Sequence, residues 1–412
     1  MMRIALVARC GDPLGSHPGP GSAAEAARVS SLAQTLAGLG HRVTIYARRD
    51  SARPAGAIAA PGVTVEHVTA GPPAPLDAGQ LAPHMPEFGR RLAQIWRRNR
   101  PDLVHAHFWT TGLAALAGAQ DLGLPVVQTF GSLAAAEHRH GLPVRLPEDR
   151  AALETGIARL ADMVLASSTE EFADLGRLGV PRARARMVPC GVDLERFSPE
   201  GPAVKRTARH RLLAAQPSAA ARSIADALAT LTLVPEAELV VMGDPEPDLL
   251  QLAARLGVRD RLVFTGPVAP DDLPPLLRSA DLLVSTAPFE PVGTTAIQAM
   301  ACGTPVVTTA AGAERDAVVD MTTGLYATPG NPAELAFWIR QLLTNRMRLE
   351  ACGIAAADRA RSRYSWERIG RETLAAYACC TRRPDAASGV EDPRPHRVEA
   401  RDVRQIPAGA PA

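Results

Sequence analysis

Several features that would assign this sequence to a functional class are missing from it. Lys and Arg number 45 against 43 Asp and Glu, so the net charge is only +2, and no basic stripe follows any one helical segment. Because nucleic-acid binding requires concentrated positive charge, we expect no nucleic-acid partner. No apolar run reaches the roughly 20 residues of a membrane-spanning helix, so no transmembrane segment is expected.

Cysteines and aromatic residues are also scarce. None of the six cysteines has the paired spacing of a metal site, and the adjacent Cys379 and Cys380 have a poor geometry for a disulfide, so a reduced cytoplasmic protein is the simplest interpretation. The amino terminus begins directly with an apolar strand and lacks the long apolar core and cleavage site of a signal peptide. Aromatic residues make up 4%, which together with abundant Ala, Arg and Pro is typical of a GC-rich bacterial gene.

What the sequence does contain is a repeated alternation of apolar runs and helical patterns. Residues 3–8 (RIALVA) form an apolar run, the helical pattern that follows closes on Gly40, and HRVTIYA forms a second run. Further along, a helix is predicted over 169–178 between two more apolar runs. Continuous apolar strands that alternate with helices predict parallel sheets covered on both faces.

The length of 412 residues exceeds what one ordinary core supports, so two domains are expected. We predict one Rossmann-like α/β domain over residues 1–200 and a second over 207–365, joined by a polar linker rich in Pro and Gly. An amphipathic helix at 366–382 is expected to pack across the domains. The tail, 384–412, has few large apolar residues and is expected to be disordered. Ligands of doubly wound domains bind at the carboxyl ends of the strands, and here also in the cleft between domains.

The most specific stretch is FEPVGTTAIQAMACGTPVVTTAAG at residues 289–312. It resembles the signature of family-four glycosyltransferases, in which a Glu-Pro-Phe-Gly turn opens a helix and a second Glu follows eight residues after the first. The order of the other segments, through RYSW at 363–366, is similar to that family as well. The resemblance implies the GT-B fold, with two doubly wound Rossmann-like domains that face a cleft, and an enzyme that uses a nucleotide sugar.

The resemblance also implies roles for individual residues. Glu290 would act as the catalytic residue by hydrogen-bonding the hydroxyl groups of the donor sugar. The helix start after it carries unpaired amides and partial positive charge, which suit a phosphate. The implied donor-binding residues are Arg222, Val292, Gly293, Thr294, Thr295 and Gln298.

Several positions depart from the family's pattern. Ala23 and Ala24 replace a Gly-Gly pair, Gly131 replaces a His near the reacting sugar, and the remaining substitutions are Pro217 for Arg, Arg222 for Lys, Ser223 for Gly and Gln298 for Glu. Gln still donates and accepts hydrogen bonds but lacks the charge of Glu. Loss of one preorganised electrostatic donor typically costs roughly 3–4 kcal/mol of barrier, although a guanidinium at position 222 still suits phosphate.

Three histidines are further candidates for the cleft. His105 and His107 are two residues apart at the carboxyl end of a predicted strand, so both side chains point to one face, either to contact a ligand or acceptor or to pack. His138 lies with Glu137 and His140 in the loop after Gly131, where a histidine could replace the missing one.

Two hypotheses from different classes remain open. The first is a retaining glycosyltransferase that moves a sugar from a UDP- or GDP-sugar to a hydroxyl of a small-molecule or glycan acceptor, without a metal or other cofactor, as is usual in the family. The second is a catalytically impaired relative that serves as a binding or scaffolding partner of another protein. An epimerase of the same architecture is less well supported, because the Glu-Pro-x-Gly stretch is not typical of those enzymes.

Overall fold

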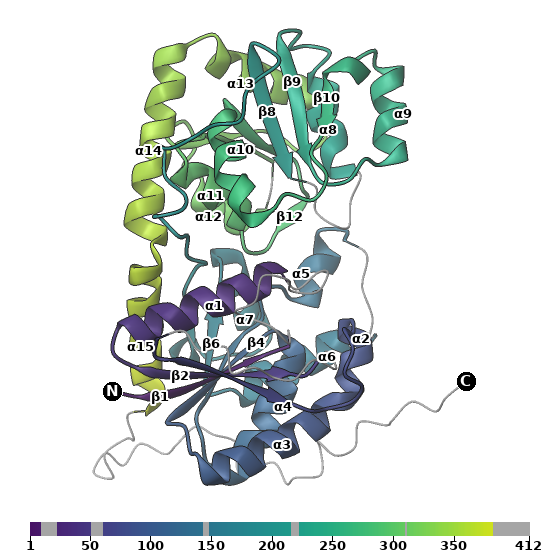
Figure 1. Cartoon of the computed structure of the whole chain (residues 1–412). Helices are drawn as coiled ribbons and strands as arrows, with labels where there is room; N and C mark the ends of the chain where they lie inside the picture. The colour runs from purple at the N-terminus through teal and green to yellow at the C-terminus, as the bar shows by residue number, and fades with distance from the viewer. Residues whose placement is uncertain (10–22, 51–60, 143–147, 216–221, 310, 382–412) are drawn as a thin grey trace.

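The computed structural model of the chain describes two α/β domains stacked end to end (Figure 1). The residues described are 1–9, 23–50, 61–142, 148–215, 222–309 and 311–381. The first domain lies below and the second above in this view. Among the described helices, none is both long and apolar enough to cross a bilayer.

The first domain contains a seven-stranded parallel sheet with the strand order β3-β2-β1-β4-β5-β6-β7. Its strands are β1 (Arg3–Ala8), β2 (Arg42–Arg48), β3 (Val63–Val68), β4 (Leu103–His107), β5 (Val126–Thr129), β6 (Met163–Ala166) and β7 (Ala185–Met187). Its helices are α1 (Ala23–Gly38), α2 (Ala78–Leu81), α3 (Met85–Arg98), α4 (Trp109–Ala119), α5 (Ala134–Arg139), α6 (Arg150–Leu160) and α7 (Thr169–Arg177). Strand β4 is buried along its whole length, because helices cover both faces of the sheet.

The second domain repeats this arrangement with a six-stranded parallel sheet in the order β10-β9-β8-β11-β13-β15. Its strands are β8 (His210–Ala215), β9 (Ala237–Met242), β10 (Leu262–Phe264), β11 (Leu282–Ser285), β13 (Val306–Thr308) and β15 (Gly324–Tyr326). A separate two-stranded sheet pairs β12 (Phe289–Glu290) with β14 (Ala311–Gly312). The helices are α8 (Arg222–Thr230), α9 (Pro247–Arg255), α10 (Leu273–Ser279), α11 (Thr294–Ala301), α12 (Ala313–Ala317), α13 (Pro332–Leu343) and α14 (Arg346–Tyr364).

The strand order reverses at the same place in both sheets. The reversal falls between β1 and β4 in the first domain and between β8 and β11 in the second. Loops that leave two such strands diverge to opposite faces of the sheet, which opens a crevice for a ligand at their carboxyl ends. The doubly wound α/β fold expected from the sequence is therefore confirmed, and each domain has one topological switch point.

The last two helices return the chain from the second domain to the first. Helix α14 packs on α11 and α13, whereas α15 (Trp366–Thr381) packs on α1 and β6. In Figure 1 the two helices run down one side of the molecule. The contact with α1 is close, because a Cβ atom at Gly370 would lie 2.5 Å from Thr35 Cγ2. Together α14 and α15 thus contact both domains. The predicted disordered tail lies outside the described residues.

Candidate functional site

The turn that opens helix α11 has the form expected of a phosphate-binding helix start. Gly293 has a φ of +66°, in the left-handed region, and its amide donates to Glu290 Oε1 at 3.4 Å. Burial raises the pKa of the Glu290 carboxyl, and the amides of Gly293 and Val292 act in the opposite direction. No side chain caps α11, so the amides of Thr294 and Thr295 are available to a ligand.

Two glycines, Gly293 and Gly312, allow the Glu290–Gly293 turn to lie close to the segment at 312–314. Strand β12 pairs Glu290 with Gly312, where a Cβ atom would lie 2.5 Å from the Glu290 carbonyl oxygen. A Cβ atom at Gly293 would meet backbone atoms of Ala313 and Glu314 at 3.3 Å. Larger residues at either position would push the two turns apart, so the glycines fix the place of Glu290.

Glu314, which the sequence reasoning did not single out, lies behind this turn. Its side chain is 2% exposed and accepts a hydrogen bond from Thr308 Oγ1 at 2.8 Å. Burial, and then the nearby charge of Glu290, raise the pKa of Glu314 to about 7. Because two neighbouring carboxylates resist ionising together, Glu314 favours a proton when Glu290 is charged. The available signal was an acidic residue two positions after Gly312, the last residue of the signature stretch.

The other predicted donor residues lie on the first turns of α11. Thr294, Thr295 and Gln298 are half-buried, and residues 294 and 298 share one face of the helix. Thr294 Oγ1 points to Cys190 Sγ at 4.0 Å, in the segment that leaves the first domain. The start of α11 therefore faces the first domain.

The two predicted strand-end histidines lie on one face of β4, and both are buried. Their ring centroids are 4.1 Å apart. His105 contacts the Tyr377 hydroxyl through Nδ1 at 2.7 Å and Thr129 Oγ1 through Nε2 at 2.8 Å. Burial lowers the pKa of His105 to about 3, and burial with the charges of His105 and Arg28 holds the pKa of His107 well below its usual range. His107 has no hydrogen-bond partner for either ring nitrogen among the described residues.

A second residue that sequence reasoning missed, Arg28 on α1, lies beside Gly131. Gly131 has a φ of +76°, and a Cβ atom there would lie 3.0 Å from Arg28 Nη2. The place where the resemblance implies a histidine side chain is therefore taken by a guanidinium. His138 is exposed on α5, whereas the ring of His140 stacks on that of Phe289, with centroids 4.7 Å apart.

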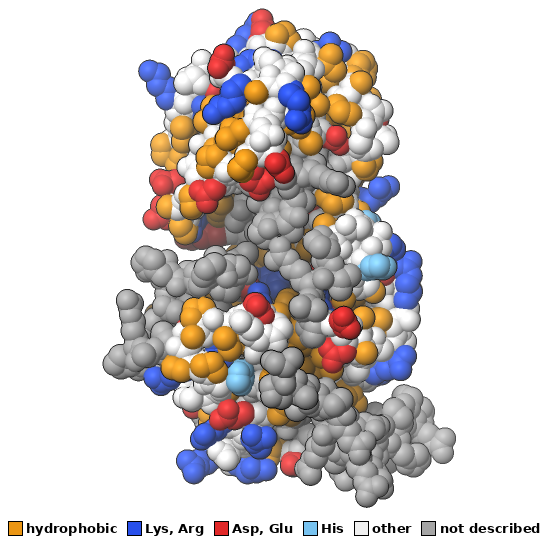
Figure 2. All heavy atoms as spheres, turned by 90° about the vertical axis from the view of Figure 1, so that its right-hand side faces the viewer, with side chains coloured by type: hydrophobic (Ala, Val, Ile, Leu, Met, Phe, Trp, Pro, Cys, Tyr) orange, Lys and Arg blue, Asp and Glu red, His pale blue; other side chains and the backbone are white. Residues whose placement is uncertain are grey.

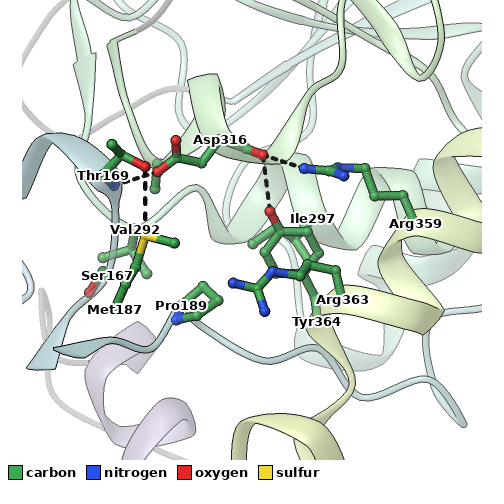
Figure 3. Close-up of a pocket in the computed structure, with 11 residues that line it drawn as sticks. Ser167, Thr169, Met187, Pro189, Val292, Ile297, Asp316, Arg359, Arg363 and Tyr364 are labelled. Atoms are coloured by element: carbon green, nitrogen blue, oxygen red, sulfur yellow. Dashed lines mark hydrogen bonds between the residues drawn. The ribbon is translucent and has the colours of Figure 1, made fainter. Parts of the chain in front are cut away.

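The two domains contact each other through the first turn of α7. The amide of Thr169 donates to Asp316 Oδ2 at 2.6 Å, and the amide of Gly312 donates to Glu170 Oε2 at 2.9 Å. A cavity of about 170 Å³ lies behind these contacts and is lined by Pro189 of the first domain and Val292 of the second (Figure 3). Figure 2 shows acidic side chains along the edge of the second domain that faces the first. These contacts place the turn before α11 next to the first domain.

For several other predicted residues the structure does not describe the side chain, or does not describe the residue at all. Arg222 begins α8 and Ala23 and Ala24 begin α1, but their side chains are not among those described, and Pro217 lies outside the described residues. Their roles in donor binding stay predictions. In the described part of the chain, no cluster of three or more His, Cys, Asp or Glu side chains could hold a metal ion. Metal-independent chemistry likewise stays a prediction.

Comparison with known proteins gives a consistent result. Residues 26–196 match the family model "Glycosyltransferase Family 4", and residues 217–359 match "Glycosyl transferases group 1". D-inositol 3-phosphate glycosyltransferase of Geodermatophilus obscurus is 32% identical, with 94% of this chain and 91% of that protein covered. The enzyme of the same name from Kribbella flavida is also 32% identical, with 92% and 96% covered.

Solved structures show the same fold. Sucrose-phosphate synthase from Thermosynechococcus elongatus superposes with a TM-score of 0.79 at 24% identity, over 92% of this chain and 98% of that one. Anabaena HepE in complex with UDP and glucose gives a TM-score of 0.68 at 19% identity, over 92% and 100%. Both are similar in having two α/β domains with parallel sheets. With the family models and the full-length relatives in agreement, this chain belongs to the family-four glycosyltransferases, transferase enzymes of the GT-B fold.

Proposed function

We propose that this glycosyltransferase moves a sugar from a UDP- or GDP-sugar to a hydroxyl group of its acceptor, with retention of configuration at the anomeric carbon. The observation that carries the proposal is the uncapped start of α11, with the Glu290 carboxylate held 3.4 Å from the Gly293 amide. HepE, which has this fold, was solved with UDP and glucose bound. An unpaired helix start suits a diphosphate, and the carboxylate beside it suits the hydroxyls of the attached sugar.

In the proposed reaction the bond between the anomeric carbon and the diphosphate oxygen breaks, and a bond to the acceptor oxygen forms. The acceptor's hydroxyl proton goes to the departing diphosphate. Negative charge grows on that diphosphate in the transition state, where the amides of Thr294 and Thr295 and the α11 dipole stabilise it. Glu290 accepts hydrogen bonds from the sugar, Gln298 hydrogen-bonds the ribose, and Arg222 supplies the cation.

The relatives suggest a first acceptor to test. They are named for D-inositol 3-phosphate, and they align with this chain over more than nine-tenths of its length. We therefore include that polyol phosphate in the acceptor panel, beside its unphosphorylated parent.

Calorimetric titration with UDP, GDP, ADP and their common sugars tests the donor site. We expect micromolar binding of at least one nucleotide, with the sugar-dependent part of the affinity lost in Glu290→Ala. The matched control is Glu367→Ala, which removes an exposed carboxylate from α15. Failure of the whole panel to bind and to turn over would overturn the proposal and favour the scaffolding alternative. The proton NMR spectrum of the first product would report retention or inversion directly.

A further inference from the structure

Helix α1 places a guanidinium, that of Arg28, at the first-domain side of the site, where it has no hydrogen-bond partner among the described residues. Arg28 is half-buried, its Nε is buried and unsatisfied, and no hydrogen bond or ion pair joins it to the rest of the described chain. Glu25 and Glu171 interact with it through their charges, and each has one carboxylate oxygen bound elsewhere and the other without a hydrogen-bond partner among the described residues. Glu25 accepts from Arg9 Nε at 2.6 Å, and Glu171 accepts from the Ser167 amide at 2.6 Å.

A small pocket of about 30 Å³ adjoins this guanidinium. Arg28, His105, His107, Thr129 and Cys190 contribute to its lining. His105 already uses both ring nitrogens, whereas the 2% exposed ring of His107 uses neither. A neutral imidazole keeps one N–H donor. The pocket therefore offers a permanent cation and a buried donor, neither of which has a hydrogen-bond partner among the described residues.

The pocket lies next to the proposed donor site. Cys190 lines it, and the hydroxyl of Thr294, on the first turn of α11, points to Cys190 Sγ at 4.0 Å. A substrate whose diphosphate occupies the α11 start would thus reach the pocket with its reacting end. At about 30 Å³ the space suits the oxygens of one functional group, not a whole sugar ring.

Gly131 makes room for the guanidinium. A side chain at position 131 would begin 3.0 Å from Arg28 Nη2. A histidine at this position, as the resemblance implies, would act as a neutral donor to a sugar hydroxyl. Arginine is always charged and binds oxyanions through two parallel N–H groups. The exchange changes the group preferred here from a hydroxyl to an anion.

We propose that Arg28 and His107 form an oxyanion-recognition subsite that selects a carboxylate or phosphate carried by the substrate. The inference rests on the proposed function for the neighbouring donor site. The anion has two sources, a phosphate on the acceptor or the carboxylate of a uronic-acid donor sugar. Either source would make Arg28 a specificity-determining residue.

Two matched ligand pairs distinguish the sources. With UDP at saturation, calorimetry compares D-inositol 3-phosphate with myo-inositol; in a separate series it compares UDP-glucuronate with UDP-glucose. We expect the anionic member of one pair to bind about 10- to 100-fold more tightly, as charge-assisted bidentate hydrogen bonds provide. Arg28→Gln should reduce this preference to less than about 3-fold, and Arg28→Lys should keep part of it. Arg90→Gln, an exposed arginine of the same domain, is the control.

A titration with inorganic phosphate, followed by the ¹⁵N resonances of the His107 ring, needs no donor at all. Phosphate should shift these resonances in the wild type and in Arg90→Gln, but not in Arg28→Gln. A shift that persists without Arg28, or an absence of both the shift and the ligand preference, overturns the subsite. UDP affinity separates the two proposals: if no nucleotide binds, the proposed function fails, and the phosphate titration still decides on the subsite.

Discussion

Replacing the Gln298 amide with a carboxylate should strengthen donor binding. Gln298 lies half-buried on α11, one turn after Thr294, and the family pattern has a carboxylate there. A carboxylate accepts charge-assisted hydrogen bonds from a ribose diol, and these exceed neutral ones by about 1 kcal/mol. Gln298→Glu should therefore tighten nucleotide binding about 5-fold in calorimetry. Gln34→Glu, on α1, is the matched control, and equal affinities of wild type and Gln298→Glu would show that residue 298 does not contact the ribose.

A side chain at Gly131 should lower the stability of the folded chain. The Gly131 φ of +76° costs an L-residue about 1–2 kcal/mol, and the added Cβ would also press on the guanidinium of Arg28. Gly141 has a similar φ of +69° with open space around it, so Gly141→Ala reports the backbone strain alone. We expect Gly131→Ala to lower the thermal midpoint more than Gly141→Ala does. Equal losses would mean that Arg28 moves aside freely.

Glu314 should make stability depend on pH. Its pKa is about 7 in the folded chain against 4.5 for an ordinary Glu, so between these values the folded state binds the extra proton. Stability contributed by the protonated group is complete below pH 4.5 and is lost as the pH rises to about 7. Glu314→Gln should flatten this decline and raise the thermal midpoint at pH 8 relative to wild type. Parallel midpoint curves of the wild type and the variant from pH 5 to 8 would contradict the assignment, and the exposed Glu350→Gln serves as control.

At the scale of elements, helix α7 connects the domains through its first turn. Asp316 of α12 accepts the Thr169 amide at 2.6 Å and so caps a helix of the other domain. Asp316→Ala should weaken the association of the two domains by about 1 kcal/mol of free energy. The domains should then adopt more open arrangements relative to each other. Small-angle X-ray scattering should then show a larger radius of gyration than for Asp358→Ala, which removes an exposed carboxylate from α14. An unchanged radius would mean that other contacts hold the domains.

Most elements could be predicted because their local pattern is strong. The helix predicted over 169–178 is α7 (Thr169–Arg177), and the apolar run at 3–8 is β1. Strands β3 and β15 were missed, since VTVEHV contains three polar residues and the three-residue segment Gly324–Tyr326 is too short to show a period. The small sheet of β12 and β14 depends on two turns meeting, which no local pattern encodes.

The parts of the candidate site that could be predicted are those formed by residues close together in the sequence. The Glu290–Gly293 turn is local, so its form follows from the sequence of the signature. Arg28 is about a hundred residues from Gly131, and their meeting depends on how α1 crosses the sheet and on the left-handed φ of the glycine. Glu314 acquired its raised pKa from burial, which likewise arises from tertiary packing.

At the scale of the whole molecule, the C-terminal helix supports the first domain's strand end. The Tyr377 hydroxyl of α15 contacts His105 Nδ1 at 2.7 Å, in a fully buried position. Tyr377→Phe would leave that ring nitrogen unsatisfied, at a cost of about 1–3 kcal/mol. A lower thermal midpoint and an altered ¹⁵N signal of the His105 ring should follow. Cys379→Ala, at an exposed position of the same helix, should change neither, and an unaltered His105 signal in Tyr377→Phe would contradict the contact.

The return of α15 to the first domain also bears on how the protein is made. Ala376 and Tyr377 belong to the same apolar core as Ile4 and Leu6, yet the ribosome adds them after the entire second domain. The surface of the first domain along α1 therefore stays uncovered until α15 has been synthesised, although the first domain precedes the second in the chain. A premature stop codon between the second domain and α15 would consequently damage the first domain, and chaperones that cover apolar surface would be needed by the first domain until α15 emerges.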